Sequence, residues 1–456
     1  MIDILIITIS YLVPWYLGWV VVSLLDKHDN LAYLYKLAVS FLIGIGLMTT
    51  IIFIYTWTGG NLVGRTLLPM MITPIILLEI IHFKFKSEFS FKKCYKEVKK
   101  IKEIIKWKKL NLILLTLLVI YVLSQSVLGA YQIIHNPTYD FDAWNNWNLR
   151  PKVIYTQHQL PMNKPNEFFL GGGIKSYPLN DPLLKVWQAS LLTKWNENVI
   201  NLYSLVFYIA LIFLFYQSLP KIFSRTIKLI STYLLASLPF LVLHSRIAYA
   251  DLEITSFIFL AYSALFMYLQ TRDKPYLYIS AFGLAFSIWT KNEGFALVLP
   301  SLIIFMIFLV ISKQLRFKTS IKYLLTSLFI VSPWLLFRWL YDLDVLSGDS
   351  SSFNMIFQVS EFTRWFSLLL FRSHFSFLLI ALFIIMILKI KDIYHSQSLQ
   401  KMTFAFLLLF ALYNFVFMFT DKSQSLNAMI RANMQIIPIA VLLLISYINK
   451  FFAQNR

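Results

Sequence analysis

The chain has 456 residues, of which 58% are hydrophobic and 14% are charged, and its mean hydropathy is +0.67. This composition excludes an ordinary soluble globular protein and is typical of a chain that lies in a bilayer. The net charge of +19 does not indicate a nucleic-acid partner, because eleven lysines are concentrated between Lys84 and Lys109. We expect that loop to lie in the cytoplasm, near anionic head groups. The single cysteine, Cys94, excludes an intramolecular disulfide.

Apolar runs of about 20 residues can cross a hydrocarbon core, and the sequence predicts about thirteen of them. The fold class that follows is an all-α polytopic membrane protein. No cleavage site follows the first run, so we expect this run to remain as an anchor. The predicted spans are 2–25, 37–57, 67–83, 110–131, 198–217, 229–243, 252–269, 276–290, 295–312, 323–340, 365–388, 403–420 and 434–449.

The charges of the loops predict the orientation of the chain. With the lysine-rich loop inside, alternation puts 27 of the 41 Lys and Arg on the inner side, as the positive-inside rule requires. Residues 1–109 are then three N-terminal transmembrane helices with a cytoplasmic loop. Residues 110–456 form a transmembrane core with one long extracytoplasmic loop, 132–197. That loop is too long for a simple connector, so we expect it to carry function.

Two acidic residues near the start of this loop are candidates for a chemical role. Asp140 and Asp142 are two residues apart, and we expect an extended backbone there, on which their carboxylates would point the same way. Either could act as a general base or as a metal-binding carboxylate. The alternative is that one of them caps the next helix while the other is solvated.

Two short helices are predicted in the same loop, both lying along the membrane surface. The first covers Ala143–Arg150, ends at Pro151, and carries Trp144 and Trp147 on one face, where they suit the head-group region. The second begins at the Asp181-Pro182 pair, which reads as a cap followed by proline in the first turn. Its apolar side would consist of Leu183, Val186, Trp187 and Leu191.

A second acidic segment, HSRIAYADLEI, lies between two predicted spans and contains Arg246, Asp251 and Glu253. Ionisable groups at membrane depth cost about 2.5–3.5 kcal/mol each, so they usually have a partner or a function. In one interpretation Asp251 caps a helix and pairs with Arg246. In the other, Asp251 or Glu253 helps the first-loop acids to hold a divalent cation, Mg or Mn.

Two further segments offer cations at the outer ends of spans. In WTKNEG, Lys291 either forms a surface ion pair with Glu293 or donates to a lipid-linked phosphate. In LNAMIRANMQIIP, Arg431 either extends its charge to the interface or binds phosphate. The sequence contains no Walker loop, GxGxxG or GxSxG pattern, and thus no sign of ATP, dinucleotide or acyl-serine chemistry.

Taken in order, these segments resemble the membrane-embedded glycosyltransferases of the C type (GT-C), the superfamily of protein O-mannosyltransferases and aminoarabinose transferases. The segments YDFDAW and SYPLNDPLLKVW resemble the first outer loop of that superfamily, RIAYADLEI its second acidic loop, and WTKNEG and LNAMIRANMQIIP its late loops. The resemblance covers roughly 110–456. The three spans ahead of this core are a departure from the better-known members.

The resemblance implies an inverting transferase that moves a sugar from a polyprenyl-phosphate donor to an acceptor hydroxyl or amine on a glycan, lipid or protein. It would lie in a bacterial inner membrane, with its site outside the cytoplasm. Asp142, or else Asp140, would be the base, and the donor phosphate would rest on Lys291, Arg431 or Arg246. The substrate pocket would be lined by Trp144, Trp147, Tyr177, Asp181 and Glu293.

Two other classes compete with this interpretation. An O-antigen polymerase or ligase would use the same kind of lipid-linked donor with a different acceptor. A transporter or flippase of a lipid-linked saccharide would place ionisable residues near the bilayer midplane and often show inverted repeats. The predicted span interiors contain almost no charge, which favours an enzyme.

Overall fold

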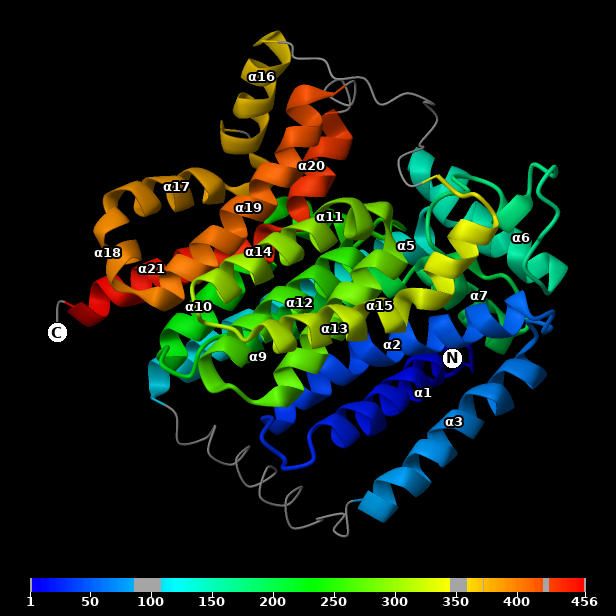
Figure 1. Ribbon diagram of the computed structural model, residues 1–456. Coiled ribbons are helices and arrows are strands. Elements are labelled where there is room, and N and C mark those ends of the chain that lie inside the picture. Colours follow the sequence, from blue (N-terminus) through cyan, green and yellow to red (C-terminus); the bar gives the residue numbers. More distant parts are fainter. Residues whose placement is uncertain (1, 86–107, 345–358, 372, 421–425, 455–456) are drawn as a thin grey trace. The chain divides into compact units, whose positions relative to one another are not determined.

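The computed structural model describes residues 2–85, 108–344, 359–371, 373–420 and 426–454 (Figure 1). These residues form helices joined by short connections, and no β-strand occurs among them. A helix satisfies its backbone hydrogen bonds within one segment, which an apolar chain in lipid requires. The predicted class, an all-α polytopic membrane protein, is confirmed.

The chain divides into two compact units, each of which consists of two stretches of sequence. Unit 1 contains Met1–Gly173 and Pro182–Tyr233, and unit 2 contains Ile174–Asp181 and Leu234–Arg456. Both sides of the predicted boundary between residues 109 and 110 lie in unit 1. The units are thus a different partition of the chain, and the predicted division into an N-terminal part and a core stays a prediction.

Unit 1 is built around the contact between its first two helices. The glycines Gly18 and Gly44 face the opposite backbone there: a Cβ added to Gly18 would lie 1.9 Å from the Ser40 oxygen, and one added to Gly44 would lie 1.8 Å from the Pro14 oxygen. Small residues let membrane helices approach this closely. The helices of unit 1 are α1 (Ile2–Leu25), α2 (Tyr33–Trp57), α3 (Gly64–Phe85), α5 (Lys109–His135), η1 (Ala143–Trp147), α6 (Leu149–Gln157), η2 (Phe169–Gly171), most of α7 (Asn180–Leu192), α8 (Glu197–Ile200), α9 (Tyr203–Ser218) and the first part of α10 (Arg225–Ala236).

Unit 2 is centred on α12 (Asp251–Thr271), which is buried along almost its whole length. It packs against α13 (Lys274–Thr290), where a Cβ on Gly283 would lie 2.5 Å from the Ala261 nitrogen (Figure 1). The other helices of unit 2 are α11 (Pro239–His244), η3 (Gly294–Val298), α14 (Leu299–Ile311), α15 (Phe317–Leu340), α16 (Val359–Phe366), η4 (Ser367–Phe371), η5 (Ser373–Phe375), α17 (Leu378–Leu388), α18 (Ile390–His395), α19 (Gln397–Phe419), α20 (Leu426–Met434) and α21 (Ile437–Gln454).

The predicted number of spans is not confirmed. Among the described residues, nine helices are long and apolar enough to cross a membrane, or ten if the bent pair of α20 and α21 is one span. The predicted run 229–243 is interrupted where Pro239 starts α11, and the run 365–388 is divided among α16, η4, η5 and α17. The run 276–290 falls in α13, which has only 17 residues.

The first outer loop differs from its predicted structure. Asp142 has helical φ and ψ angles of −66° and −26°, and the amides of Ala143 and Trp144 bond to the Asp140 carbonyl. The extended backbone expected at Asp142 is thus wrong. Pro151 does not end a helix either, because it sits in the first turn of α6, where a missing amide hydrogen costs little.

The two helices predicted to lie along the membrane surface also differ from the prediction. Residues 143–147 form a π-helix, so that Trp144 is 51% exposed while Trp147 is only 1% exposed. The helix α7 begins at Asn180, and all residues from 181 to 190 are buried. A helix buried on every side is a core element, so α7 does not present one apolar side to lipid.

We expect Gly44→Val to destabilise unit 1, because the new side chain would collide with the Pro14 backbone. Overpacking of this kind typically costs about 1–3 kcal/mol. Thermal unfolding of the purified protein in detergent measures the effect. The control is Ile54→Val on the same helix, where the side chain is 41% exposed; equal midpoints for the two variants would contradict the close contact of α1 and α2.

Candidate functional site

A fully buried carboxylate, that of Asp251, collects cations from two distant segments of unit 2. Lys291 donates from Nζ to Oδ1 at 3.0 Å. Arg431 donates to Oδ2 from Nη2 at 2.9 Å and from Nε at 3.1 Å. Asp251 starts α12, where the positive end of the helix dipole also favours a negative charge. The structure thus brings together three residues that the sequence singled out separately.

Lys291 bridges two carboxylates. It follows the last residue of α13, and its Nζ lies 2.8 Å from Oε1 of Glu293 as well as 3.0 Å from Asp251. Burial lowers the pKa of the Lys291 ammonium, but the two carboxylates outweigh burial and hold this pKa above its usual value. The side chain of Glu293 is 23% exposed and that of Lys291 only 4%. Glu293 is consequently the solvent side of this bridge.

Arg431 reaches Asp251 from a broken helix. The axes of α20 and α21 differ by 53° at a short break, and α20 carries Arg431. Reciprocal amide bonds of 3.0 and 2.9 Å between Asn414 and Asn433 join α20 to α19. The guanidinium lies 4.2 Å from the centre of the Tyr249 ring and its side chain is 17% exposed. These contacts fix the guanidinium between buried Asp251 and the surface.

The imidazole of His244 completes the surroundings of Asp251. Its Nδ1 lies 4.0 Å from Oδ2 of Asp251, which is too far for a hydrogen bond. Burial lowers the pKa of His244 to about 4, so the ring is neutral at pH 7. The imidazole thus adds no charge to the cluster, and the formal charges of Asp251, Glu293, Lys291 and Arg431 sum to zero.

The short stretch Ile174–Asp181 contributes polar groups to unit 2. Asn180 donates from Nδ2 to Oε1 of Glu253 at 2.7 Å and to Oγ1 of Thr290 at 2.9 Å. The Tyr177 ring centre lies 5.9 Å from the Lys291 ammonium, and burial raises the pKa of Tyr177 to about 12. Asp181 is fully buried. Of the residues predicted to line a substrate pocket, Tyr177 and Glu293 thus lie at the Lys291 ammonium.

One cation near Lys291 was missed by the sequence interpretation. Arg338, near the end of α15, donates from Nη1 to Oδ1 of Asn292 at 3.0 Å. Its guanidinium lies 5.9 Å from the ring centres of Phe295 and Trp334. The sequence could have indicated this residue, because Arg338 in FRWLYDLD lies near the end of a predicted span, as Arg431 does.

The other predicted residues belong to one or the other of the two units. Asp140, Asp142, Trp144 and Trp147 belong to unit 1; the Trp147 carbonyl accepts a 2.9 Å bond from the buried Lys185. Asp140 and Asp142 are half-buried. Arg246 belongs to unit 2 and is half-buried.

A divalent cation finds no support in the described geometry. Asp251 is occupied by Lys291 and Arg431, and Glu253 accepts from Asn180. Within the described ranges, no group of three or more His, Cys, Asp or Glu could hold a metal ion. The predicted Mg or Mn site stays an untested prediction.

The cluster lies largely within a region of recognised sequence similarity. Neither a curated protein nor a solved structure matches the chain. The matched range, residues 180–337, contains Asp251, Glu253, Lys291 and Glu293, whereas Arg431 lies beyond it. Residues 180–337, about a third of the chain, match the family model described as dolichyl-phosphate-mannose-protein mannosyltransferase, and this confirms the predicted resemblance to GT-C glycosyltransferases over that range.

Proposed function

We propose that this protein is an integral membrane glycosyltransferase that moves a sugar from a polyprenyl-phosphate donor to an acceptor hydroxyl or amine at the outer face of the membrane. The observation that carries the proposal is the cluster around Asp251, in a chain whose residues 180–337 match a family described by a lipid-phosphate sugar donor. Two cations held by a buried carboxylate form a preorganised site for an anion, and such electrostatics usually supply the largest part of catalysis.

In this proposal Asp251 is a positioning residue and Arg431 binds the donor phosphate. Asp251 is fully buried, whereas the Arg431 side chain is 17% exposed, so the carboxylate fixes the guanidinium from the protein side. Arginine suits phosphate because its planar donors can bind two oxygens at once. As the sugar leaves, negative charge grows on the phosphate, and a fixed guanidinium stabilises it.

Lys291 contributes by exchanging one partner. Its ammonium is held by buried Asp251 on one side and by the partly exposed Glu293 on the other. A donor phosphate would replace Glu293, while Asp251 keeps the ammonium in place. Arg246 of the same unit is a further candidate for this phosphate.

The acceptor is activated by a first-loop carboxylate, for which we propose Asp142, with Asp140 as the alternative. The carboxylate takes the proton of the acceptor group, whose oxygen or nitrogen then bonds to the anomeric carbon. The bond from that carbon to the polyprenyl phosphate breaks with inversion, and the phosphate leaves with the electron pair. Trp144, Trp147, Tyr177 and Asp181 are proposed to shape the substrate pocket.

We expect Arg431→Gln to reduce binding of a radiolabelled polyprenyl-phosphate sugar by about 100-fold, since losing one partner of a buried charge pair costs about 2–5 kcal/mol. Part of this loss could reflect the uncompensated charge of Asp251. The double variant Asp251→Asn with Arg431→Gln removes both charges. We expect it to recover thermal stability without recovering donor binding; recovery of both would reduce Arg431 to a structural role.

Glu293→Gln is the matched control: whereas Arg431→Gln removes a positive charge from the cluster, Glu293→Gln removes a negative charge beside Lys291. It removes the partner that the phosphate would replace, so we expect donor affinity to rise about fivefold, the scale of a partly exposed ion pair. Weaker binding by this variant would contradict the proposed exchange on Lys291.

Asp142→Asn should lower transfer by about 100-fold to 10,000-fold, the usual contribution of a general base, and leave donor binding unchanged. Asp140→Asn is tested beside it to identify the base. Transfer from the radiolabelled donor is measured for both single variants and for the double variant. Undiminished transfer in the double variant would remove both acids from the mechanism.

The outer location of the first loop is tested by labelling. In intact cells, a cysteine at the exposed position Asn163, introduced in a Cys94→Ser background, should react with a membrane-impermeant thiol reagent. Native Cys94, which lies outside the described residues, should react only after the membrane is opened. The reverse pattern would place the loop in the cytoplasm.

A further inference from the structure

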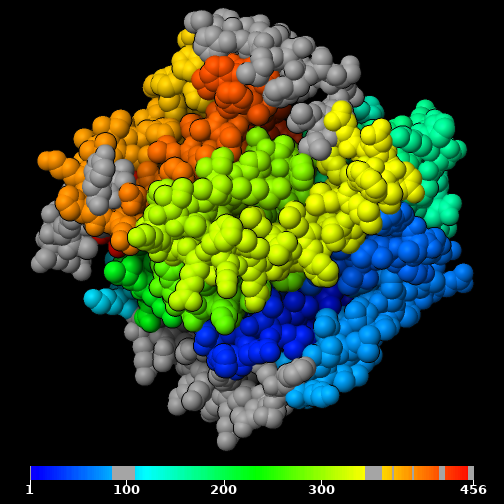
Figure 2. Space-filling model, viewed as in Figure 1, coloured from blue at the N-terminus to red at the C-terminus, as the bar shows by residue number. Residues whose placement is uncertain are grey.

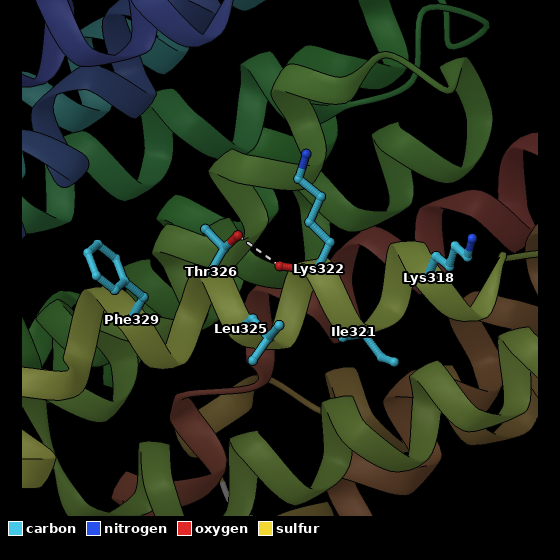
Figure 3. A pocket seen from close by; sticks show the side chains of 6 residues that line it. All are labelled: Lys318, Ile321, Lys322, Leu325, Thr326 and Phe329. Carbon is cyan, nitrogen blue, oxygen red and sulfur yellow. Dashed lines mark hydrogen bonds between the residues drawn. The ribbon is translucent and has the colours of Figure 1, made fainter.

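A shallow hollow of about 380 Å³ lies along one face of α15. Figure 3 shows that all its lining side chains come from this helix, with Lys318 at one end of the row and Phe329 at the other. The helix is long and apolar enough to cross a membrane, and its side chains reach the surface in Figure 2. The lining residues, here called the α15 groove, are Lys318, Ile321, Lys322, Leu325, Thr326 and Phe329.

The positive charge of the α15 groove is confined to its first part. Lys318 and Lys322 are exposed and stand one helical turn apart. The Lys322 ammonium lies 5.3 Å from the centre of the Tyr278 ring of α13, which restricts its position. No ion pair joins either lysine to a carboxylate in the described part of the chain. Lys318 also lies in the first turn of α15, where the helix dipole favours an anion.

The rest of the α15 groove is apolar and uncovered. Ile321 is 40% exposed, Leu325 61% and Phe329 79%. The Thr326 hydroxyl donates to the Lys322 carbonyl at 2.8 Å, so it satisfies the helix itself (Figure 3). From Lys318 to Phe329 the helix rises about 16 Å. The surface thus changes from cationic to apolar along one line within a potential span.

We infer that the α15 groove binds one anionic phospholipid, with its phosphate at Lys318 and Lys322 and an acyl chain along Leu325 and Phe329. A free phosphate or a nucleotide would use the two amines but not the exposed apolar row. An acidic peptide would leave that row facing lipid. The sequence predicts this end of α15 on the cytoplasmic side, where anionic lipids attract basic residues near the membrane.

This inference does not depend on sugar transfer, and its test requires no donor. The full-length protein in a neutral detergent is titrated with phosphatidylglycerol or phosphatidylcholine of identical acyl chains, and the bound lipid is counted by native mass spectrometry. We expect one phosphatidylglycerol to bind with clear preference. One lysine near a membrane surface corresponds to about a fivefold change in affinity. The double variant Lys318→Gln with Lys322→Gln should therefore lower the affinity for phosphatidylglycerol, relative to phosphatidylcholine, by about 25-fold.

Two variants separate charge from accidental effects. Lys318→Arg with Lys322→Arg keeps both charges and should keep the preference. Lys313→Gln removes an exposed lysine that is close in sequence but outside the α15 groove, and it should bind like the unaltered protein. Equal binding of both lipids by the unaltered protein, a preference that survives in the double glutamine variant, or an equal loss in Lys313→Gln would each overturn the assignment.

Discussion

The burial of the Asp251 carboxylate is the constraint on which the arrangement of unit 2 depends. A carboxylate with no exposure needs cations close enough to offset its lost hydration. Lys291 and Arg431 supply them from positions 40 and 180 residues away in the chain. The end of α13, the start of α12 and the helix α20 therefore have to meet. Removing one partner would leave an uncompensated charge, so the three residues act as one unit.

The helix that supplies Arg431 is separated from α21 by a break. A straight helix would continue the apolar path of α21, whereas the 53° bend gives α20 its own direction. The buried amide pair of Asn414 and Asn433 then fixes α20 on α19. Irregular helices at membrane depth are tolerated where protein or a polar cavity satisfies them. The broken helix brings a partly exposed arginine to a fully buried acid.

Rigid packing beneath the cluster supports its precision. The contact of Gly283 with Ala261 lets α12 and α13 approach closely. Asp251 is the first residue of α12 and Lys291 follows the last residue of α13, so this packing supports both. Asn180, which bonds to Glu253 and Thr290, joins the same two helices through side chains. Charged groups held by such supports need little reorganisation when charge develops on a ligand, which is the physical basis of electrostatic catalysis.

The sequence by itself determined the solvent and the candidates. Long apolar runs have to be helices in lipid, and ionisable residues beside those runs, among them Asp251, Lys291, Glu293 and Arg431, stand out because burial is costly. Local rules failed where packing decided: Trp147 is buried, Pro151 lies in the first turn of a helix, and α7 is covered on all sides.

Only the tertiary structure decided which charges are partners. The partners that the structure shows for Asp251 are Lys291 and Arg431, and the sequence did not single out either of them as its partner. Sequence spacing carries information about neighbours within a helix, where geometry is fixed by the backbone. Contacts across 180 residues depend on how whole helices pack, and that is a property of the folded chain.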